Sequence, residues 1–296
     1  MSLPAVRMAD LRAALEAAGA PPRRRHGQHF LQDANLLAAI VRDAEVTPQD
    51  TVLEIGPGPG LLTRELLATG ARVLAVEIDT RVRQVAGALI EPELAERLQW
   101  IEADALAGSR ELSPELLAVL PRCTRVVANL PYNIAVTLVV NLLREPTAPE
   151  RLVVMVQREV GERLLAGPGS KAYGSLSVIT GLLATGRILR RVPPTAFWPP
   201  PKVQSVVVGL DRRADRPSEP ELKELDAFLA GAFHSRRKIM LNSLAGHAGC
   251  TASEVARRLG LDENSEKRRA EACLPVQLFR LAHAWAITAP SGLNRS

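Results

Sequence analysis

Cysteine, aromatic residues and long hydrophobic runs are all scarce in this sequence. The three cysteines, Cys123, Cys250 and Cys273, lie far apart without C-x-x-C spacing, which supports neither a disulfide framework nor a zinc site. No apolar run reaches the roughly 18 residues that a membrane-spanning helix needs. The opening MSLPAVRMADLRAAL holds an aspartate where a signal peptide is continuously apolar. We therefore expect a cytoplasmic protein that binds neither metal nor membrane.

The composition is that of a folded, mildly basic protein. Hydrophobic residues make up 47% of the 296 residues, which is enough for a sizeable core. Aromatic residues make up only 3%, so an aromatic side chain beside a motif carries more weight than usual. The formal net charge of +5 fits a polyanionic partner, although charge alone does not identify one.

Short apolar strands alternate with helices along the first two-thirds of the chain. This alternation predicts right-handed β-α-β crossovers and a parallel sheet with helices on both faces. Two later strands, 186–193 and 203–211, flank the proline-rich PPTAFWPPPK and are expected to pair like a hairpin. The other expected strands are 51–55, 71–79, 98–104, 124–129 and 151–157, and the expected helices are 9–19, one beginning near 35, 61–69 and 136–143.

The composition changes after the segment DRRADRPSEPE, and we place a linker at 212–220. We therefore predict three parts, which are an N-terminal helix and basic loop at 1–33, an α/β domain at 34–212 and a helical domain at 213–296. Within the last part, helices with basic faces are expected at 221–233, 236–246, 252–260 and 275–286.

Three of the expected strands run into residues that suit a ligand. In an open parallel sheet, ligands bind beyond the carboxyl ends of the strands. The first strand leads into EIGPGPG, where Gly56 and Gly58 let the backbone turn tightly and approach a ligand, although a tight turn without a ligand has the same pattern. Its G-x-G-x-G spacing argues against a dinucleotide. Glu77 is placed to accept bonds from ribose hydroxyls and Asp104 faces the same crevice, with a helix N-cap as the alternative for either acid.

The fourth strand ends in Asn129-Leu130-Pro131-Tyr132, which joins an amide, a rigid turn and an aromatic ring. Pro131 fixes its backbone angle φ and stiffens the turn. Tyr132 offers a face on which a base can stack, a contact typically worth ~1–3 kcal/mol per base. A turn that ends a strand and a core tyrosine form the alternative interpretation.

The glycine loop, Glu77 and Asp104 together resemble the class I S-adenosylmethionine-dependent methyltransferases. The tetrapeptide NLPY is similar to the motif with which such enzymes hold an exocyclic amine. The segments RRRHGQHFLQD, GPGSKAYGSLSV, PPTAFWPPPKVQSVVV and AFHSRRKIMLNSL resemble motifs of the ribosomal RNA adenine N6-dimethyltransferases. The resemblance covers about residues 22–285 and is strongest to the bacterial small-subunit branch.

This resemblance implies a Rossmann-like domain with a mostly parallel seven-stranded sheet and a small all-α C-terminal domain. It implies that S-adenosylmethionine donates methyl groups, leaving S-adenosylhomocysteine, to N6 of two adjacent adenosines in the 3′-terminal hairpin loop of small-subunit ribosomal RNA. The implied partners are this RNA and the immature small subunit, bound by a monomer. The implied cofactor contacts are His29, Leu31, Gly56, Gly58, Glu77, Asp104 and Asn129, of which His29 stands where the family usually has asparagine.

The residues of the NLPY motif suit the chemistry of an adenine amine. The N6 lone pair is delocalised into the ring, so the nitrogen is a poor nucleophile. The Asn129 side-chain oxygen and a backbone carbonyl, expected to be that of Leu130, can accept the two N6 hydrogens and localise that lone pair. Phe197 or Trp198 is the expected second ring against the base, opposite Tyr132. The expected catalytic set is therefore Asn129, Leu130, Pro131, Tyr132 and Phe197.

Basic clusters at Arg23, Arg24 and Arg25 and at Arg236, Arg237 and Lys238, which are expected to open a helix, suit contacts to RNA phosphates. A solvated helix face is the alternative for each cluster. Two other functions remain open at this point. One is a methylase of large-subunit RNA of the antibiotic-resistance type, or of DNA adenine, and the other is a non-catalytic ribosome assembly factor with the same fold.

Overall fold

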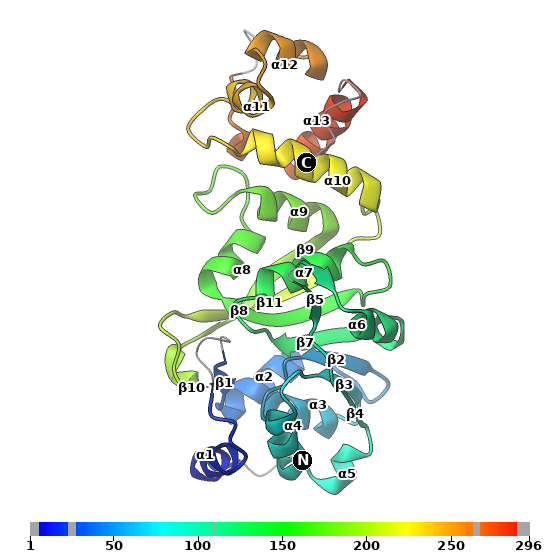
Figure 1. The fold of residues 1–296 in the computed structure, drawn as a ribbon, viewed down its shortest axis with the longest axis vertical. Helices are drawn as coiled ribbons and strands as arrows, with labels where there is room; N and C mark the ends of the chain where they lie inside the picture. Colours follow the sequence, from blue (N-terminus) through cyan, green and yellow to red (C-terminus); the bar gives the residue numbers. More distant parts are fainter. Residues whose placement is uncertain (1–5, 23–27, 109, 263–266, 289–296) are drawn as a thin grey trace. The chain divides into compact units, whose positions relative to one another are not determined.

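The structure, a computed structural model, describes residues 6–22, 28–108, 110–262 and 267–288. It divides into two compact units (Figure 1). Unit 1 comprises Met1–Gly161 and Thr185–Arg212, and unit 2 comprises Glu162–Ala184 and Arg213–Ser296. The division into three parts expected from the sequence stays a prediction, because compactness does not show whether a part is an independent domain.

A seven-stranded sheet in the order β4-β3-β2-β7-β8-β11-β9 forms the centre of unit 1. The pairs β2–β3, β3–β4, β2–β7 and β7–β8 are parallel, and β11 pairs antiparallel with β8. The expected mostly parallel seven-stranded sheet is therefore confirmed. Its strands are β2 (Thr51–Ile55), β3 (Arg72–Val76), β4 (Leu98–Ile101), β7 (Arg125–Asn129), β8 (Arg151–Gln157), β9 (Ala184–Val192) and β11 (Ser205–Arg212).

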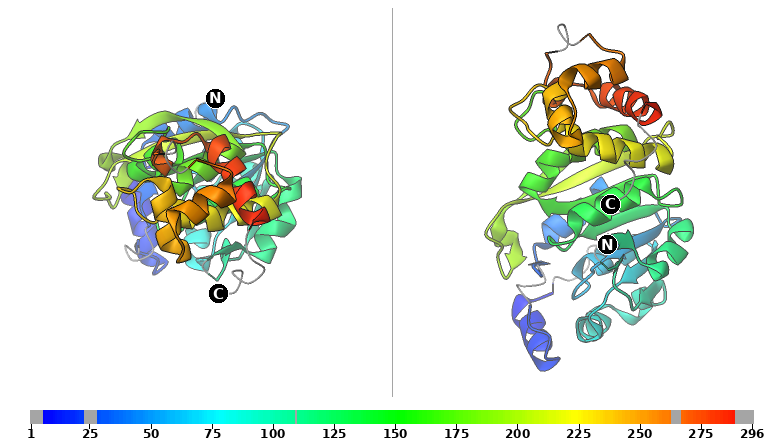
Figure 2. Two further views of the ribbon diagram at one scale, coloured as in Figure 1. Left: turned by 90° about the horizontal axis from the view of Figure 1, so that it is seen from above. Right: turned by 45° about the horizontal axis from the view of Figure 1, so that its top comes forward.

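Strand residues are buried on both faces of this sheet, which explains their near-continuous apolar runs. Val52, Val73 and Val127 belong to a core cluster on one face. Their neighbours in sequence, such as Leu53 and Leu74, point to the other face and are also buried, because side chains alternate along a strand. Helices accordingly cover both faces (Figures 1 and 2).

Capping residues in the sequence mark where helices of unit 1 begin. Asp33 caps α2, with its side chain accepting a hydrogen bond from the Leu36 N–H at 3.1 Å, and Ser113 caps α6 in the same way. The helices are α1 (Met8–Ala17), α2 (Ala34–Asp43), α3 (Leu61–Ala68), α4 (Thr80–Leu89), α5 (Pro92–Ala95), α6 (Pro114–Val119), η2 (Leu120–Arg122), α7 (Ala135–Arg144) and η3 (Pro194–Ala196), with α8 (Arg158–Leu164) crossing into unit 2.

Two small sheets were not expected from the sequence. In one, β1 (Phe30–Leu31) pairs antiparallel with β10 (Phe197–Trp198), which joins segments almost 170 positions apart in the chain. In the other, β5 (Leu106–Ala107) pairs with β6 (Glu111–Leu112). Strands of two residues carry no periodic signal, so only the tertiary structure reveals them.

The glycine loop between β2 and α3 depends on backbone conformations that favour glycine. Gly56, Gly58 and Gly60 all have positive φ angles, of 66°, 57° and 80°. A Cβ atom at Gly58 would lie 2.9 Å from the Phe30 ring, so the close approach of β1 also requires glycine there. The loop is therefore specified both by its own turn and by its neighbour.

Unit 2 consists of packed helices, in agreement with the expected helical C-terminal region. Helix α11 begins at Met240, so the prediction that Arg236, Arg237 and Lys238 open a helix is wrong. They lie in the turn that precedes it. The elements are α9 (Ser175–Leu183), α10 (Glu219–Ala232), α11 (Met240–Ala248), α12 (Ala252–Leu259), η4 (Ala270–Ala272) and α13 (Pro275–Ile287).

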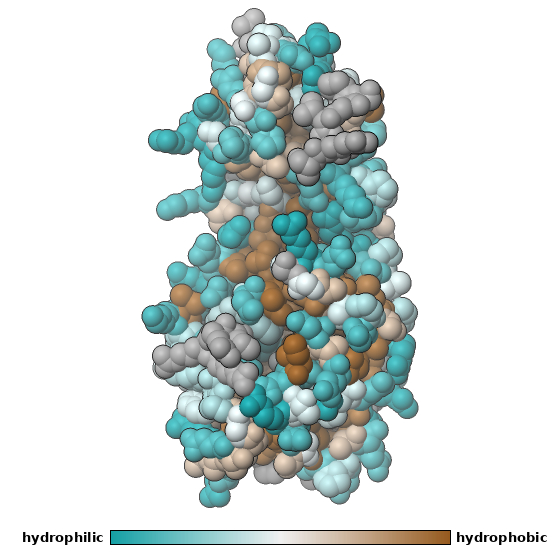
Figure 3. Space-filling view, viewed as in Figure 1, coloured by the Kyte–Doolittle hydropathy of each residue, from teal (hydrophilic) through white to brown (hydrophobic). Residues whose placement is uncertain are grey.

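Hydrophilic residues cover most of the face shown in Figure 3, with hydrophobic patches between them. Within the described ranges, none of the helices combines the length and the apolar character needed to span a bilayer.

Candidate active site

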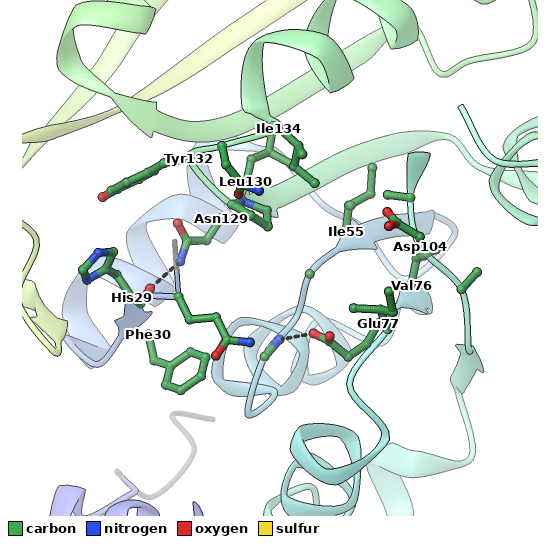
Figure 4. A pocket seen from close by; sticks show the side chains of 18 residues that line it. His29, Phe30, Ile55, Val76, Glu77, Asp104, Asn129, Leu130, Tyr132 and Ile134 are labelled. Atoms are coloured by element: carbon green, nitrogen blue, oxygen red, sulfur yellow. Dashed lines mark hydrogen bonds between the residues drawn. The ribbon is translucent and has the colours of Figure 1, made fainter. Parts of the chain in front are cut away.

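A cavity of about 310 Å³ lies at the carboxyl ends of β2, β3, β4 and β7 in unit 1 (Figure 4). Parallel strands bring their carboxyl ends to one edge of a sheet, so residues far apart in sequence meet there. Glu77 and Asp104 lie across this cavity from Asn129 and Tyr132. Its lining comprises Gln28, His29, Phe30, Ile55, Gly56, Gly58, Val76, Glu77, Ile78, Ala103, Asp104, Ala105, Asn129, Leu130, Pro131, Tyr132, Asn133 and Ile134.

Glu77 connects the tip of β3 to the glycine loop. Its Oε2 accepts a hydrogen bond from the Gly58 N–H at 3.2 Å, and its Oε1 accepts one from the Asp79 N–H at 3.0 Å. The side chain is only 7% exposed. Burial raises the pKa of Glu77 above its ordinary value, while the two N–H donors oppose this rise by stabilising the carboxylate. Each oxygen keeps a second lone pair, with which it can accept a bond from a ligand.

Asp104 is more exposed than Glu77 and lies beyond the end of β4. Its Oδ1 accepts a hydrogen bond from the Leu106 N–H at 3.0 Å, a local turn contact rather than a helix cap. Its side chain lines the same cavity as Glu77. The two carboxylates that follow successive strands therefore meet at one ligand-sized space.

Glu54 is a buried acid that the sequence analysis did not single out. It precedes the glycine loop on β2, is 1% exposed, and its Oε2 has no hydrogen-bond partner among the described residues. Burial, together with the nearby negative charge of Glu77, raises the pKa of Glu54 to about 8 from an ordinary value of 4.5. The sequence feature that could have pointed to Glu54 is its position at the start of the EIGPGPG segment, just before the glycine loop.

The Asn129–Tyr132 turn is held by contacts at both ends. Asn129 Nδ2 donates a hydrogen bond to the His29 carbonyl at 3.1 Å, which leaves Oδ1 as the acceptor of this amide. The Tyr132 hydroxyl lies 2.6 Å from Ser205 Oγ on β11. Burial raises the pKa of Tyr132, so its hydroxyl stays protonated near neutral pH and offers no base. The turn therefore presents an acceptor and an anchored ring side by side.

Three other residues predicted for the site have different surroundings from the cavity lining. Leu31 is buried beneath the glycine loop, where it lines a small cavity of about 30 Å³ together with Glu54. Phe197 is 2% exposed and belongs to the hydrophobic core. Trp198 packs against that core with the Arg12 guanidinium 5.0 Å from its ring centroid. Neither Phe197 nor Trp198 lines the cavity that holds Tyr132.

The basic residues predicted to contact RNA fall into three sets. Arg23, Arg24 and Arg25 lie outside the described residues. Arg236 donates hydrogen bonds to the carbonyls of Lys171 and Tyr173 at 2.9 and 3.0 Å and faces Glu271, all within unit 2. Arg237 and Lys238 follow it in the same turn and are exposed. All three side chains are exposed, but Arg236 is also bonded to two backbone carbonyls.

The cavity suits a ligand that carries hydroxyl groups and positive charge. Two carboxylates line it, and the EIGPGPG loop has no lysine with which to hold a phosphate. No group of three or more histidine, cysteine or acidic residues that could hold a metal ion occurs in the described part of the chain. The residues present therefore fit S-adenosylmethionine, which has ribose hydroxyls and a sulfonium cation but no phosphate.

Fold and cavity together define a class I methyltransferase, because the antiparallel strand β11 lies between β8 and β9 at the end of a mostly parallel sheet whose carboxyl edge carries the site. A profile described as ribosomal RNA adenine dimethylase matches residues 20–280. The chain belongs to this family, and the resemblance inferred from its motifs is confirmed.

Individual relatives agree with this assignment. The Ribosomal RNA small subunit methyltransferase A of Phenylobacterium zucineum is 42% identical over 93% of this chain and 92% of its own. A dimethyladenosine transferase from Plasmodium falciparum has a similar crystal structure, with a TM-score of 0.70 and 25% identity over 86% of this chain and 96% of that chain. The 23S rRNA methyltransferase ErmE has a TM-score of 0.59 and 25% identity over 87% and 99% of the respective chains.

The raised pKa of Glu54 leads to a prediction for the pH dependence of stability. Between about pH 5 and 8 the folded state retains a proton that the unfolded state has lost, so this residue makes the protein less stable as pH rises. The neutral isostere Glu54→Gln removes this effect. We expect the variant to gain stability relative to wild type across this window, by on the order of a few kcal/mol.

Urea unfolding at a series of pH values measures this difference. Glu102→Gln is the matched control, because Glu102 is an exposed acid whose side chain contacts Thr80 and Arg83. A stability difference between Glu54→Gln and wild type that stays constant from pH 5 to 8 would show that Glu54 is ionised in the folded protein.

Proposed function

We propose that this protein transfers methyl groups from S-adenosylmethionine to N6 of two adjacent adenosines in the 3′-terminal hairpin loop of small-subunit ribosomal RNA, forming N6,N6-dimethyladenosine. The observation that carries the proposal is the cavity itself. It combines two carboxylates suited to the cofactor with an Asn-Leu-Pro-Tyr turn suited to an adenine amine. Membership of the adenine dimethylase family supports the same reaction.

The cofactor is proposed to bind on the carboxylate side of the cavity. Glu77 would accept hydrogen bonds from the ribose hydroxyls, and Asp104 would face the adenine end. Gly56 and Gly58 allow the backbone to approach without a Cβ in the way. When bound, the cofactor supplies an electrophilic methyl group on a sulfonium. The carboxylates that line the cavity would stabilise the positive charge of the sulfonium.

The target adenine is proposed to bind on the side of the NLPY turn. Asn129 Oδ1 and the Leu130 carbonyl would accept the two N6 hydrogens, which orients the nitrogen lone pair towards the methyl donor. Tyr132 would stack on the base. Alkylation makes the nitrogen strongly acidic, so the proton it then loses can pass to solvent water without a strong general base, and orientation and electrostatics carry the reaction.

The small subunit is the proposed substrate, rather than the large subunit. The curated relatives are named as small-subunit methyltransferases and reach 42% and 44% identity over at least 84% of this chain. ErmE, a 23S rRNA methyltransferase, is only 25% identical. Hairpin loops suit the chemistry, because their bases are already partly unstacked and are easily extruded.

A role in small-subunit biogenesis follows from this substrate, with the immature small subunit as the partner of a monomeric, cytoplasmic enzyme. The alternative of a non-catalytic assembly factor predicts that the residues of the chemistry have decayed. Here the glycine loop, Glu77, Asp104 and the NLPY turn are all present and line one cavity. We therefore favour an active enzyme.

Incubation with labelled S-adenosylmethionine and undermethylated small subunits tests the proposed reaction directly. We expect label on two adjacent adenosines near the 3′ end of the RNA, located by mapping of the RNA. Asn129→Ala should reduce transfer at least about a hundredfold, because it removes an acceptor aligned with the amine. Asn141→Ala on α7, outside the cavity, is the control. Label on large-subunit RNA instead would overturn the choice of substrate.

The cofactor assignment predicts a loss of affinity when the ribose acceptor is removed. Glu77→Ala should weaken binding of S-adenosylmethionine at least about tenfold in calorimetry, since it deletes both the acceptor and the bond to the Gly58 N–H. Glu102→Ala, a nearby exposed acid that does not line the cavity, should bind normally. Equal affinities of the Glu77 and Glu102 variants would remove Glu77 from the cofactor site.

The two kinds of basic residue in unit 2 predict different variant phenotypes. Neutralising Arg237 and Lys238 together should weaken binding to small-subunit RNA and reduce the slope of log affinity against log salt by about two, because two phosphate contacts are lost. Arg236→Gln should instead lower the unfolding free energy, because its guanidinium bonds to backbone carbonyls. An unchanged salt slope in the double variant would show that these side chains are merely solvated.

A further inference from the structure

His29 makes contacts that belong to the base side of the cavity rather than to the cofactor side. Its Nδ1 lies 2.6 Å from the Pro199 carbonyl oxygen. Its imidazole stacks on the Tyr132 ring, with centroids 5.5 Å apart and planes inclined by 28°. Figure 4 shows the imidazole at the Tyr132 end of the cavity, away from Glu77 and Asp104.

The bond to Pro199 fixes both the protonation pattern and the orientation of the imidazole. A carbonyl oxygen only accepts, so Nδ1 carries the proton and donates it to Pro199. A ring held at Nδ1 can turn little about its own axis. It therefore keeps one face towards Tyr132, as the small angle between the two planes requires.

Tyr132 is held at its hydroxyl end as well as at its ring. The hydroxyl bonds to Ser205 Oγ at 2.6 Å, and Ser205 is fully buried at the start of β11. The imidazole supports the ring itself. Because the tyrosine side chain is fixed at Cβ and at its hydroxyl, removal of the imidazole leaves the ring free to turn about the axis that joins these two atoms.

The rings expected from the sequence do not provide this support. Phe197 is in the core, and the Trp198 ring is next to the Arg12 guanidinium. Among the described residues, the ring that stacks on Tyr132 is that of His29. The main chain of His29 also contacts the base-holding turn, since its carbonyl accepts the bond from Asn129 Nδ2.

We propose that His29 is a positioning residue for Tyr132, whose ring it holds in place as the platform for the target base. This inference rests on the proposed function. It also departs from the cofactor contact expected from the family motif. A cofactor contact would make His29 variants lose affinity for S-adenosylmethionine, whereas a positioning role acts on the RNA substrate alone.

A double-mutant cycle between His29 and Tyr132 tests the proposal in the full-length protein. The variants are His29→Ala, Tyr132→Ala and the double variant, and the measured quantity is kcat/KM for undermethylated small subunits. We expect His29→Ala to lower kcat/KM about tenfold, within the range of a lost stacking contact. Because His29 acts through Tyr132, the double variant should be no worse than Tyr132→Ala alone.

Two substitutions separate the ring from the hydrogen bond. His29→Phe keeps a ring but has no donor for Pro199, and His29→Asn keeps a donor but has no ring. We expect His29→Phe to lie closer to wild type in kcat/KM, and His29→Asn to show the same fall in kcat/KM as His29→Ala. The affinity for S-adenosylmethionine, measured by calorimetry, should stay within about twofold of wild type in His29→Ala, His29→Phe and His29→Asn.

Several outcomes would overturn the proposal. Additive losses in the cycle would show that His29 and Tyr132 act independently, and a fall in cofactor affinity would return His29 to the cofactor site. If His29→Asn behaved like wild type and His29→Phe were defective, the hydrogen bond to Pro199 would be the contribution of His29 and its ring would have no role. These results differ from failure of the proposed function, in which the wild-type protein itself would not methylate small subunits.

Discussion

The parallel register of β2 and β3 is the constraint on which the rest of the site depends. It pairs Ile55 with Val76, so the glycine loop and Glu77 leave the sheet side by side. The Gly56 N–H then bonds to the Val76 carbonyl at 2.9 Å and the Gly58 N–H to the Glu77 carboxylate at 3.2 Å. A slip of one residue would turn every side chain of a strand to the other face and separate these partners. The cofactor side of the cavity is thus an extension of the strand pairing.

The other side of the cavity depends on contacts between distant segments. Asn129 is the last residue of β7, and its Nδ2 donates a hydrogen bond to the His29 carbonyl, while Tyr132 bonds to Ser205 on β11. The pairing of β1 with β10 brings the 28–31 segment against the 197–199 segment beside them. The two halves therefore differ in origin, since adjacent parallel strands build the carboxylate side and contacts between segments far apart in the sequence build the side that faces the base.

This difference explains what the sequence could and could not predict. The strands, the glycine loop and the carboxylates at Glu77 and Asp104 follow from local periodicity and from the rule that parallel strands align their ends. Motif resemblance identified Asn129 and Tyr132, but it did not determine the neighbours of Phe197, which is buried in the core. Nothing in the sequence indicated that Arg236, one of several basic residues in its cluster, bonds to two backbone carbonyls. The pairing of two-residue strands and the surroundings of a side chain are set by tertiary structure, which no local pattern records.

The anchoring of Tyr132 to Ser205 has a consequence for a reaction that must occur twice on one nitrogen. Ser205 begins the antiparallel strand β11 and is paired with Gln157 of β8, so the tyrosine hydroxyl is fastened to the sheet rather than to a loop. With the His29 imidazole against its ring as well, this platform is held in one place between the first and second transfers. In the proposed reaction, reorientation then falls to the substrate, whose monomethylated amine turns about its bond to the purine ring. The enzyme surface stays fixed, and the geometry of the second transfer is set by rotation of the monomethylated amine on the RNA base.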